Sequence, residues 1–375
     1  MLQSVRLINY RGLKDTTIPL APITLLTGTN GIGKTSVLEG LYFLLAQIPD
    51  AAVFPRYQAS WQFQTGMVVP RGSPNVQLPT FPIKGYDYPS FWEECPTRGA
   101  SECQVEAPEL RLSWKMKITD FAELTPELKN TAAAYGFPSG FGTMYALWEW
   151  KKTRITRDGH EATSTSNAAQ LLSIEQRFTP RTGESISTAC RYIDMSSVRY
   201  IPDKLSLQNE KLLTKGLKII NQQVTGVRHD GIIGRLRVII NDESEYSLGT
   251  LGVGAEAWTS LLLVLAELVS INASEELPVM FLVDEIGDGI HYSKQEEMWN
   301  FLLNFLSGYP QIQMVLTTHS HDCVEAFAKT FQGKEPGMAH IVRMLKFGEK
   351  DGVKTTTFAH DTFSNVLDYN WEARG

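Results

Sequence analysis

The sequence predicts an α/β fold in which buried strands alternate with helices, interrupted by a mixed α/β insertion. Three observations support this prediction: short apolar runs that end in glycine-containing turns, helical periodicity directly after those turns, and a region without such periodicity between about residues 50 and 190. The chain of 375 residues is longer than one domain of about 100–150 residues requires. We therefore expect a head that is divided in sequence, with residues 1–48 and 191–375 enclosing the insertion 49–190.

The composition is that of an ordinary globular protein. Hydrophobic residues make up 43% of the chain and charged residues 20%, which excludes disordered and collagen-like chains. The net charge of −6 excludes a wholly basic nucleic-acid clamp, although 35 lysines and arginines leave room for a local basic stripe. The 4 cysteines form no CxxC pair and are too few for a disulfide scaffold, so we expect reduced thiols.

No segment predicts a membrane span or a secretory signal. The longest apolar run, Trp258–Ile271, is shorter than the roughly 20 residues of a spanning helix, and it contains Glu267. Met1 leads into a charged, alternating segment instead of the apolar core of a signal peptide. We therefore expect a cytoplasmic protein without a membrane partner.

The first 48 residues carry strand, turn and helix signals in close succession. Val5–Tyr10 alternates as a half-buried strand, Gly12–Asp15 predicts a turn, and Ile23–Thr27 predicts a buried strand. Lys34–Gln47 places apolar residues on one broad face, which predicts a helix that ends before Pro49. A glycine-rich turn joins the buried strand to this helix.

That turn fits the pattern GxxxxGK[ST], whose glycines let backbone N–H groups curl around a phosphate. The helix N-terminus adds its positive dipole end, Lys34 would reach the β- and γ-phosphates, and the Thr35 hydroxyl would ligate Mg²⁺. The alternative is a chance glycine turn that caps a helix, but both flanks match the context of a phosphate loop. The candidate nucleotide-binding residues are Gly28, Thr29, Asn30, Gly31, Ile32, Gly33, Lys34, Thr35 and Ser36.

Residues 49–190 differ in character from the rest of the chain. Prolines are scattered through their first half, and no stretch sustains a heptad pattern, which excludes a coiled coil. Leu110–Ile118 and Ala146–Ile155 predict strands, whereas the polar run Arg157–Gln170 predicts a loop. We interpret this region as an insertion in the first lobe of the head.

Regular patterning returns after residue 191. Ser293 and Glu296 form a capping box that predicts the start of a helix, which Gly308 ends. The other expected elements are the strands Leu236–Ile240, Val279–Val283 and Gln313–Thr317, the turn Ser247–Gly254, the helix Ala255–Ile271, and a hairpin of Ile341–Phe347 with Val353–Phe358.

Two carboxylates follow the apolar strand Val279–Val283. A buried strand end is a costly place for two acids unless a cation or a reacting group needs them. We expect Asp284 to hold Mg²⁺ through water and Glu285 to orient and deprotonate the attacking water. The alternative is an ordinary strand-to-loop transition whose acids are solvated. The phosphate loop earlier in the chain favours the functional interpretation over this alternative.

His319 follows the strand Gln313–Thr317, with one predicted helix between this strand and the one that precedes Asp284. A strand–helix–strand crossover joins parallel neighbours, so both strand ends would lie side by side and His319 would face the γ-phosphate. The alternative is a structural histidine. His319 and His321 also raise the question of a zinc site, but only Asp322 and Cys323 stand near them, so we do not expect zinc.

Four segments together carry a resemblance to a known family. They are Val5–Lys14, the phosphate loop followed by Ser36–Glu39, the run Phe281–Ser293, and Thr317–Ser320. In these segments the chain resembles the ABC-class ATPases of the AAA15/AAA21-like group, relatives of RecF, of SMC-type heads and of the overcoming-lysogenization-defect (OLD) nucleases. The resemblance covers about residues 1–48 and 200–375. It implies a P-loop NTPase fold of the ABC/SMC-like head type.

The resemblance also implies a head-to-tail homodimer, or a higher homo-oligomer, with two ATP molecules and Mg²⁺ at the interface. The signature loop that would contact the partner's nucleotide contains Thr250, Gly252 and Gly254. Two departures lie at this interface: Val253 stands where many relatives have an acid, and residues 287–289 read Gly-Asp-Gly where relatives often have Glu-Asn-Gly. The candidate D-loop residues are Asp288 and His291, and no Q-loop can be placed.

For function, the family analogy implies an ATP-hydrolysing switch that controls a separate effector in bacterial anti-phage defence. Relatives with a C-terminal Toprim nuclease are longer, and nothing after Asp361 would supply one, so we expect a nuclease or toxin encoded nearby as partner. The alternative is a RecF-like or SMC-like ATPase that closes around DNA in repair or recombination. A transporter motor is a third class, but the crisp LSGGQ-like signature of transporter heads is absent.

Two groups of basic residues are candidate DNA-binding surfaces, although such a run is more often simply a solvated face. The first group comprises Lys151, Lys152, Arg154 and Arg157, beside Trp148 and Trp150. The second comprises Lys204, Lys211, Lys215 and Lys218.

Overall fold

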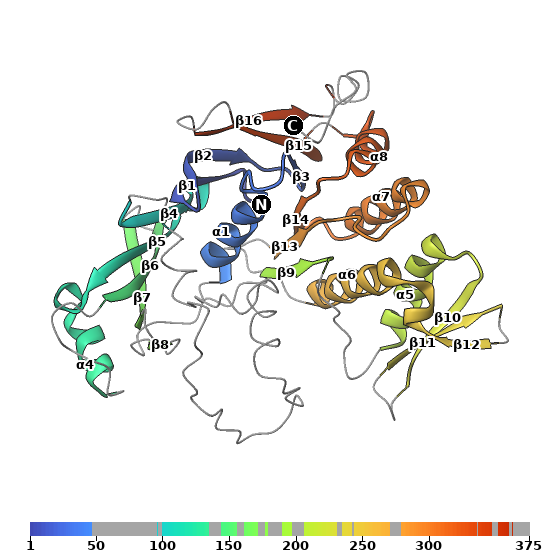
Figure 1. Ribbon diagram of the computed structural model, residues 1–375, viewed down its shortest axis with the longest axis horizontal. Helices are drawn as coiled ribbons and strands as arrows, with labels where there is room; N and C mark the ends of the chain where they lie inside the picture. Colours follow the sequence, from blue (N-terminus) through green and yellow to red (C-terminus); the bar gives the residue numbers. More distant parts are fainter. Residues whose placement is uncertain are drawn as a thin grey trace.

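The computed structural model describes residues 1–46, 96, 100–134, 144–155, 161–171, 177–178, 190–196, 206–230, 235–241, 244–270, 279–335, 337–346, 352–359 and 362. Two large sheets stand on either side of one helix, and further helices cover the outer face of the second sheet (Figure 1). A small sheet with its own helix lies at one end of the molecule. None of the helices in these ranges is both long and apolar enough to cross a membrane.

The first sheet is antiparallel and combines N-terminal strands with strands of the predicted insertion. Its order is β2 (Leu13–Pro19), β1 (Ser4–Tyr10), β4 (Glu102–Ala107), β5 (Leu112–Asp120), β6 (Met144–Ile155), β7 (Glu161–Leu171) and β8 (Arg177–Phe178). Because β4 pairs directly with β1, the described strands of the insertion extend the N-terminal sheet.

Three sequence expectations need correction in this sheet. The predicted loop Arg157–Gln170 contains β7, which pairs with β6 along its whole length. The predicted strand Leu110–Ile118 begins later, because the 3₁₀ turn η2 (Pro108–Leu110) and a left-handed Arg111 precede β5. The predicted turn Gly12–Asp15 is shorter, since β2 already begins at Leu13.

Several strands of the second sheet end at the candidate nucleotide-binding and catalytic residues. Its order is β16 (Val353–Ala359), β15 (Ala339–Lys346), β3 (Ile23–Thr27), β14 (Ile312–Thr317), β13 (Val279–Asp284) and β9 (Cys190–Asp194). All neighbours are parallel except β16, which forms the predicted hairpin with β15. Every residue of β3, β13 and β14 is buried, as expected for parallel strands covered on both faces. The expected side-by-side placement of β13 and β14 is therefore confirmed.

The helix α1 (Lys34–Ala46) fills the space between the two sheets (Figure 1). Its buried residues pack with one face of the second sheet, through Leu26 and Val315, and with the first sheet, through Trp114. The opposite face of the second sheet is covered by α6 (Val253–Ser270), α7 (Tyr292–Ser307) and α8 (His321–Phe331). Hydrophobic burial on both faces thus fixes the phosphate loop between β3 and α1.

The start of α7 differs from the sequence expectation. The N-cap is His291, whose ring Nδ1 accepts a hydrogen bond from the Ser293 N–H at 3.3 Å. Ser293 therefore lies within the first turn and does not cap the helix with Glu296. The predicted end is confirmed, since Gly308 is the C-cap.

The remaining elements form the periphery. The helix α5 (Leu207–Ile220) packs on the sheet of β10 (Val224–Asp230), β11 (Arg235–Ile240) and β12 (Ser244–Ser247), and η4 (Leu248–Leu251) leads from β12 to α6. Gly216 lets α5 approach α6 closely, because a Cβ there would lie 2.2 Å from Leu262 Cδ1. The turn η3 (Phe121–Glu123) and the helix α4 (Pro126–Ala134) follow β5.

Candidate functional site

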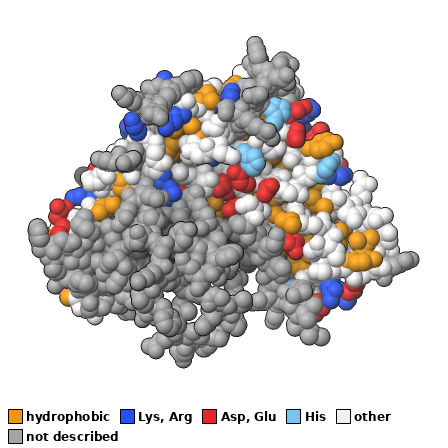
Figure 2. Space-filling view, in the orientation of Figure 1, with side chains coloured by type: hydrophobic (Ala, Val, Ile, Leu, Met, Phe, Trp, Pro, Cys, Tyr) orange, Lys and Arg blue, Asp and Glu red, His pale blue; other side chains and the backbone are white. Residues whose placement is uncertain are grey.

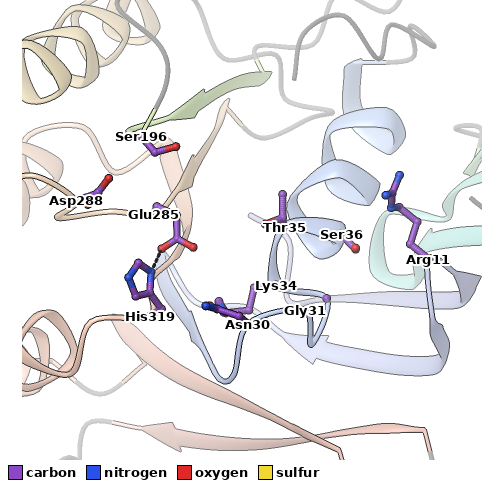
Figure 3. Close-up of a pocket in the computed structure, with 11 residues that line it drawn as sticks. Arg11, Asn30, Gly31, Lys34, Thr35, Ser36, Ser196, Glu285, Asp288 and His319 are labelled. Atoms are coloured by element: carbon purple, nitrogen blue, oxygen red, sulfur yellow. Dashed lines mark hydrogen bonds and ion pairs between the residues drawn. The ribbon is translucent and has the colours of Figure 1, made fainter. Parts of the chain in front are cut away.

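The carboxyl ends of β3, β13, β14 and β9 converge on one cleft of about 670 Å³ (Figure 3). Clefts at the carboxyl ends of parallel strands are the usual ligand sites of open α/β sheets. The phosphate loop and the first turn of α1 form one wall, and the segments after β13 and β14 form the other. The lining residues are Arg11, Asn30, Gly31, Gly33, Lys34, Thr35, Ser36, Ser196, Glu285, Asp288 and His319.

The predicted phosphate loop lies where the sequence places it, between β3 and α1. Gly28 has φ +144°, and a Cβ at this position would lie 2.5 Å from the Met344 carbonyl oxygen, so only glycine fits. Six of the nine predicted residues line the cleft; Gly28, Thr29 and Ile32 shape the loop without lining it. Ile32 instead contributes its side chain to the core between the sheets.

Lys34 is the cationic group of this wall. Its side chain is buried, and its Nζ donates to the carbonyl oxygens of Gly28 at 2.9 Å and Thr29 at 3.1 Å. Burial lowers the pKa of this ammonium, while the carboxylates of Glu285 and Asp284 act in the opposite direction. The loop therefore holds a positive charge close to two acids on the facing wall.

Asp284 ends β13 with a nearly buried carboxylate. Its Oδ1 accepts a hydrogen bond from the Thr317 hydroxyl and its Oδ2 one from the Tyr192 hydroxyl, the latter at 3.1 Å. The Thr35 hydroxyl also bonds to this carboxylate. Burial raises the pKa of Asp284 against the effect of these hydrogen bonds. Three segments distant in sequence thus fix one carboxylate beside the phosphate loop.

Glu285 adopts a left-handed backbone conformation, with φ +55°, which is uncommon for a residue other than glycine. Two bonds from β14 hold this turn: the Glu285 N–H donates to Thr317 Oγ1 at 2.9 Å, and the Ile286 N–H donates to the Thr317 carbonyl at 2.8 Å. The turn directs the Glu285 side chain into the cleft, where its Oε2 lies 2.6 Å from His319 Nδ1 (Figure 3).

Sequence reasoning missed several residues of this site. Thr317 forms hydrogen bonds that join the two acids, and Tyr192 donates a hydrogen bond to Asp284. Ser196 lines the cleft directly after β9, in a part of the chain to which the sequence assigned no functional loop. Arg11 lines the opposite end and lies 3.5 Å from the fully buried Glu39 of α1. Arg11 and Thr317 both lie in segments that carry the resemblance, but the resemblance assigned neither of them a role.

The predicted signature residues lie outside the chain's own cleft. Gly252 is exposed, with φ +94° and open space where a Cβ would lie, and Thr250 Oγ1 donates to the Ser247 carbonyl at 2.7 Å. Gly254 is buried against the segment 287–290, which contains the D-loop candidate Asp288, because a Cβ there would lie 2.0 Å from the Gly289 carbonyl oxygen. The start of α6 and this candidate D-loop segment are therefore in backbone contact within one chain.

The two D-loop candidates differ in position. Asp288 lines the cleft, whereas His291 caps α7 and does not line it. The residues considered for a zinc site do not all lie together. His321, Asp322 and Glu325 place ligand atoms within 4.8 Å of one another, whereas Cys323 is buried and its Sγ lies 3.4 Å from the Ile286 carbonyl oxygen.

The described residues of the first basic group do not share one exposed surface. Trp150 is buried and donates its indole N–H to the Phe43 carbonyl at 2.8 Å, and Lys152 is also buried, because β6 packs this face against α1. Lys151 is exposed and paired with Glu149 at 2.8 Å. Arg157, Lys204 and the side chains of Trp148 and Arg154 lie outside the described part of the chain.

In the second group, three lysines belong to α5. Lys211, Lys215 and Lys218 follow one another at helical spacing, so they share one side of the helix. All three are exposed there.

Comparison with known proteins gives a family match for part of the chain and likenesses to solved structures. The model of the AAA ATPase domain family AAA_15 matches residues 1–67. The chain is similar to the SMC head domain from Thermotoga maritima, with 13% sequence identity, a TM-score of 0.43, and coverage of 95% of this chain and 98% of that one. It is also similar to the recombination mediator protein RecF-ATPrS of the RecFOR pathway, with 10% identity, a TM-score of 0.40, and coverage of 96% and 98%. No curated protein sequence matches the chain.

The family match includes the phosphate loop and α1, which form one wall of the cleft. The other wall comes from segments more than 200 residues later, so the fold itself completes the site. The predicted resemblance is thus confirmed over residues 1–67, which are similar to the AAA ATPase domain, and the described part of the chain has the predicted α/β architecture.

Proposed function

We propose that this chain binds ATP with Mg²⁺ and hydrolyses it to ADP and phosphate. One observation carries the proposal: a phosphate loop and a carboxylate–histidine pair face each other across a single cleft (Figure 3). Its volume of about 670 Å³ falls within the range of roughly 300–1,000 Å³ that small-ligand sites occupy. The opposed walls would place the terminal phosphate between Lys34 and Glu285.

The wall formed by the phosphate loop and the first turn of α1 supplies positive charge, and no side chain has to move far for it to do so. The N-terminus of α1 presents its dipole and its first N–H groups toward the cleft. Lys34 would exchange its two loop carbonyls for phosphate oxygens, which are stronger partners for an ammonium because they are charged. The gain in charge-assisted hydrogen bonding favours the nucleotide complex.

The donor set beside Lys34 fits Mg²⁺. A nearly buried carboxylate, Asp284, is in hydrogen-bond contact with the hydroxyl of Thr35, and hard oxygen donors are what Mg²⁺ prefers. When bound, the ion would neutralise charge on the β- and γ-phosphates. Asp284 and Thr35 would hold it, while Thr317 and Tyr192 keep the carboxylate in place.

Glu285 would accept the proton of the attacking water as its oxygen bonds to the γ-phosphorus and ADP leaves. Its carboxylate projects into the cleft, and His319 fixes one of its two oxygens. His319 would thereby orient the base. From its position after β14, it would also face the γ-phosphate. Asp288 lines the same wall and would interact with a second subunit as part of the D-loop.

We further propose that the active form is a head-to-tail homodimer or higher oligomer. The signature residues Thr250, Gly252 and Gly254 do not line the chain's own cleft, and Gly252 is open to a partner. Beside them, Val253 is 58% exposed and Tyr292 is 65% exposed, which supplies apolar surface at the same place. A second subunit that covered this surface would bring its own cleft opposite the signature loop.

The biological role that we propose is control of a separate effector, a nuclease or toxin, in anti-phage defence. Its support is the family analogy. ATP binding and hydrolysis would switch the dimer between two states that the effector distinguishes.

A RecF-like or SMC-like role on DNA is the second candidate. The observation that favours it is the exposed row Lys211, Lys215 and Lys218 on α5. Phosphate contacts of such a row make binding sensitive to salt, so duplex DNA binding that weakens steeply with salt and is lost when the three lysines are changed to glutamine would support it.

The direct test of the proposed reaction is Mg²⁺-dependent phosphate release from ATP by the wild-type chain and by Glu285→Gln. The amide keeps the size of the side chain but cannot accept the proton, so turnover should fall about 10²–10⁴-fold while ATP still raises the melting temperature. The neighbouring Glu297→Gln on α7, whose carboxylate pairs with Lys294 outside the cleft, is the matched control. Equal turnover in Glu285→Gln and the wild type would exclude Glu285 as the base.

A further inference from the structure

A second hollow opens beside the nucleotide cleft. It measures about 290 Å³ and is formed by three segments: the turn 286–290 after Glu285, the start of α7 with Tyr292 and Gln295, and the residues from Thr318 through Ser320 to Asp322 of α8. We call it the lateral hollow. It shares Glu285, Asp288 and His319 with the nucleotide cleft, so the two spaces are adjacent and any group bound in one lies close to the other.

One residue of this lining, Gln295, has a buried acceptor that lacks a donor. Gln295 is 4% exposed, and its Nε2 donates to the Ile290 carbonyl at 3.3 Å. Its Oε1 is buried and has no hydrogen-bond partner among the residues that the structure describes. The next residues on this face of α7, Met298 and Trp299, are buried and apolar. A buried amide oxygen without a donor is unfavourable, which indicates a ligand that donates a hydrogen bond.

The charges around the lateral hollow are acidic. Asp288 and Asp322 are exposed carboxylates of its lining, and Glu285 is a third. Among the lining residues that the structure describes there is no lysine or arginine. His319 is the one basic side chain of this lining, and it already bonds to Glu285. Acidic side chains also gather near the middle of the face in Figure 2, over the end of β13, with a histidine beside them.

The nearby lysines are engaged elsewhere. Lys294 of α7 pairs with Glu297 at 2.9 Å, and Lys329 of α8 pairs with Glu325. Neither of them lines the lateral hollow. Lys34 acts on Glu285 from the opposite wall of the nucleotide cleft. Within the described part of the chain, however, no lysine or arginine is paired with Asp288 or Asp322.

The size and arrangement of the donors favour an organic cation over a metal ion. The hollow is several times larger than the roughly 30 Å³ that one water occupies in the liquid. The side chains that could share a metal are His321, Asp322 and Glu325, and this group does not include Gln295. An alkylammonium or guanidinium group, by contrast, carries several N–H donors on one arm and would satisfy Gln295 Oε1 and a carboxylate together.

We propose that the lateral hollow receives a basic side chain, an ammonium or guanidinium group, presented by a protein partner. The argument is charge complementarity together with the buried acceptor Gln295. Because the bound cation would lie beside Glu285 and His319, it would change the rate of hydrolysis, and this regulatory step rests on the proposed ATPase function. The binding step does not rest on it.

The probe is agmatine, which carries both a guanidinium and an ammonium group. Its binding to the nucleotide-free protein is measured by ligand-observed NMR, for the wild type and for Gln295→Leu and Asp322→Asn, neither of which lies in the nucleotide cleft. Glu297→Gln is the matched control, because it removes an acid of α7 outside the hollow. We expect about tenfold or greater loss of affinity in the first two variants and none in the control. Gln295→Leu removes a hydrogen-bond acceptor for the cation, and Asp322→Asn removes an opposite charge.

Equal binding by all variants, or no binding by the wild type, would overturn the proposal. So would Mn²⁺ binding that depends on Gln295 and is not displaced by agmatine, because the hollow would then hold a metal. If Gln295→Leu fails to fold, Gln295→Met and Asp322→Asn carry the test. A failed ATPase assay leaves these binding results intact, so the two proposals fail separately.

A second measurement identifies the partner. If agmatine reduces the self-association that a non-hydrolysable ATP analogue induces in the wild type, measured by light scattering, the basic side chain comes from a second copy of this chain. If self-association is unaffected while agmatine changes ATP turnover of the wild type, the side chain belongs to a different protein. Agmatine that binds in the lateral hollow but changes neither quantity would overturn the regulatory step.

Discussion

At the scale of single residues, the hydroxyl of Thr317 is the point that joins the two acids of the cleft. It donates its one proton to Asp284 and accepts the N–H of Glu285 at 2.9 Å. Thr317 is fully buried, so water does not compete for these bonds. The hydroxyl thereby fixes the metal-binding carboxylate and the left-handed turn of the base at once, which makes Thr317 a positioning residue of the proposed reaction.

Thr317→Val should therefore impair turnover more than nucleotide binding. Valine keeps the shape of the side chain but leaves Glu285 N–H and Asp284 without their shared partner, and loss of such a supporting contact typically costs about 10–100-fold in activity or metal affinity. Thr317→Ser, which retains the hydroxyl, should restore most of the turnover. Phosphate release at saturating ATP and the ATP-induced shift of the melting temperature give the two readouts. Wild-type turnover in Thr317→Val would contradict this role.

Asp284 gives a prediction about pH. Burial raises its pKa, so between its ordinary value of about 3.9 and the raised value the folded chain binds more protons than the unfolded chain. The free energy of unfolding therefore falls as the pH rises through this window, and the ionised carboxylate lowers stability at neutral pH.

Asp284→Asn, which cannot ionise, should melt a few degrees higher than the wild type at pH 7 without nucleotide. This gain should shrink as the pH is lowered toward 4, where the wild-type carboxyl becomes protonated. Asp288→Asn is the control, because this side chain is exposed in the same cleft. Calorimetric scans across this pH range measure the difference, and a gain that is constant with pH would contradict the assignment to Asp284 ionisation.

At the scale of elements, the contact between the start of α6 and the D-loop links the signature segment to the segment after Glu285. The backbone of Gly254 lies directly against the backbone of Gly289, since neither residue carries a side chain that would hold the two segments apart. A displacement of the D-loop therefore moves the start of α6. In the proposed dimer, this contact would connect the chain's own nucleotide to the one held by its partner.

Gly254→Ala tests this contact. Its Cβ would lie 2.0 Å from the Gly289 carbonyl oxygen, and a backbone atom gives way less easily than a side chain, so we expect a loss of about 1–3 kcal/mol in the free energy of unfolding. Gly352→Ala is the matched control, since a Cβ there meets open space. Urea unfolding measures both. Equal stability of the two variants would show that α6 and the D-loop separate easily.

The elements that the sequence predicted best are those whose own residues determine them. The strands β3, β13 and β14 are short, mostly apolar runs, and the phosphate loop and the acids at the end of β13 are local patterns. β7 was missed because the run Glu161–Leu171 is polar, and pairing with β6 overrides its weak intrinsic preference for a strand. Thr317, Tyr192 and Ser196 acquire their positions from contacts between distant segments, which no local pattern reveals.

At the scale of the whole molecule, the nucleotide cleft and the signature loop belong to different surfaces of one chain. The cleft contains Lys34 and Glu285, whereas Gly252 lies outside it with open space around it. In the proposed head-to-tail dimer, the signature loop of one chain would contact the nucleotide held by the other, so each complete site would combine parts of two chains related by symmetry. This arrangement predicts that two inactive variants can complement each other.

Lys34→Ala removes the phosphate-binding charge, and Gly252→Trp places a bulky side chain on the exposed signature loop; each alone should abolish hydrolysis. In a mixed dimer, one site inherits both defects, but the other combines an intact phosphate loop with an intact signature loop. Activity should therefore return toward about a quarter of the wild-type rate, because half of the dimers are mixed at random pairing and each has one intact site of two, provided that one site can act without the other. Light scattering with ATP reports dimer formation independently of turnover. If both variants form ATP-dependent dimers and their mixture remains as inactive as either parent, then Thr250, Gly252 and Gly254 do not act on the partner's nucleotide.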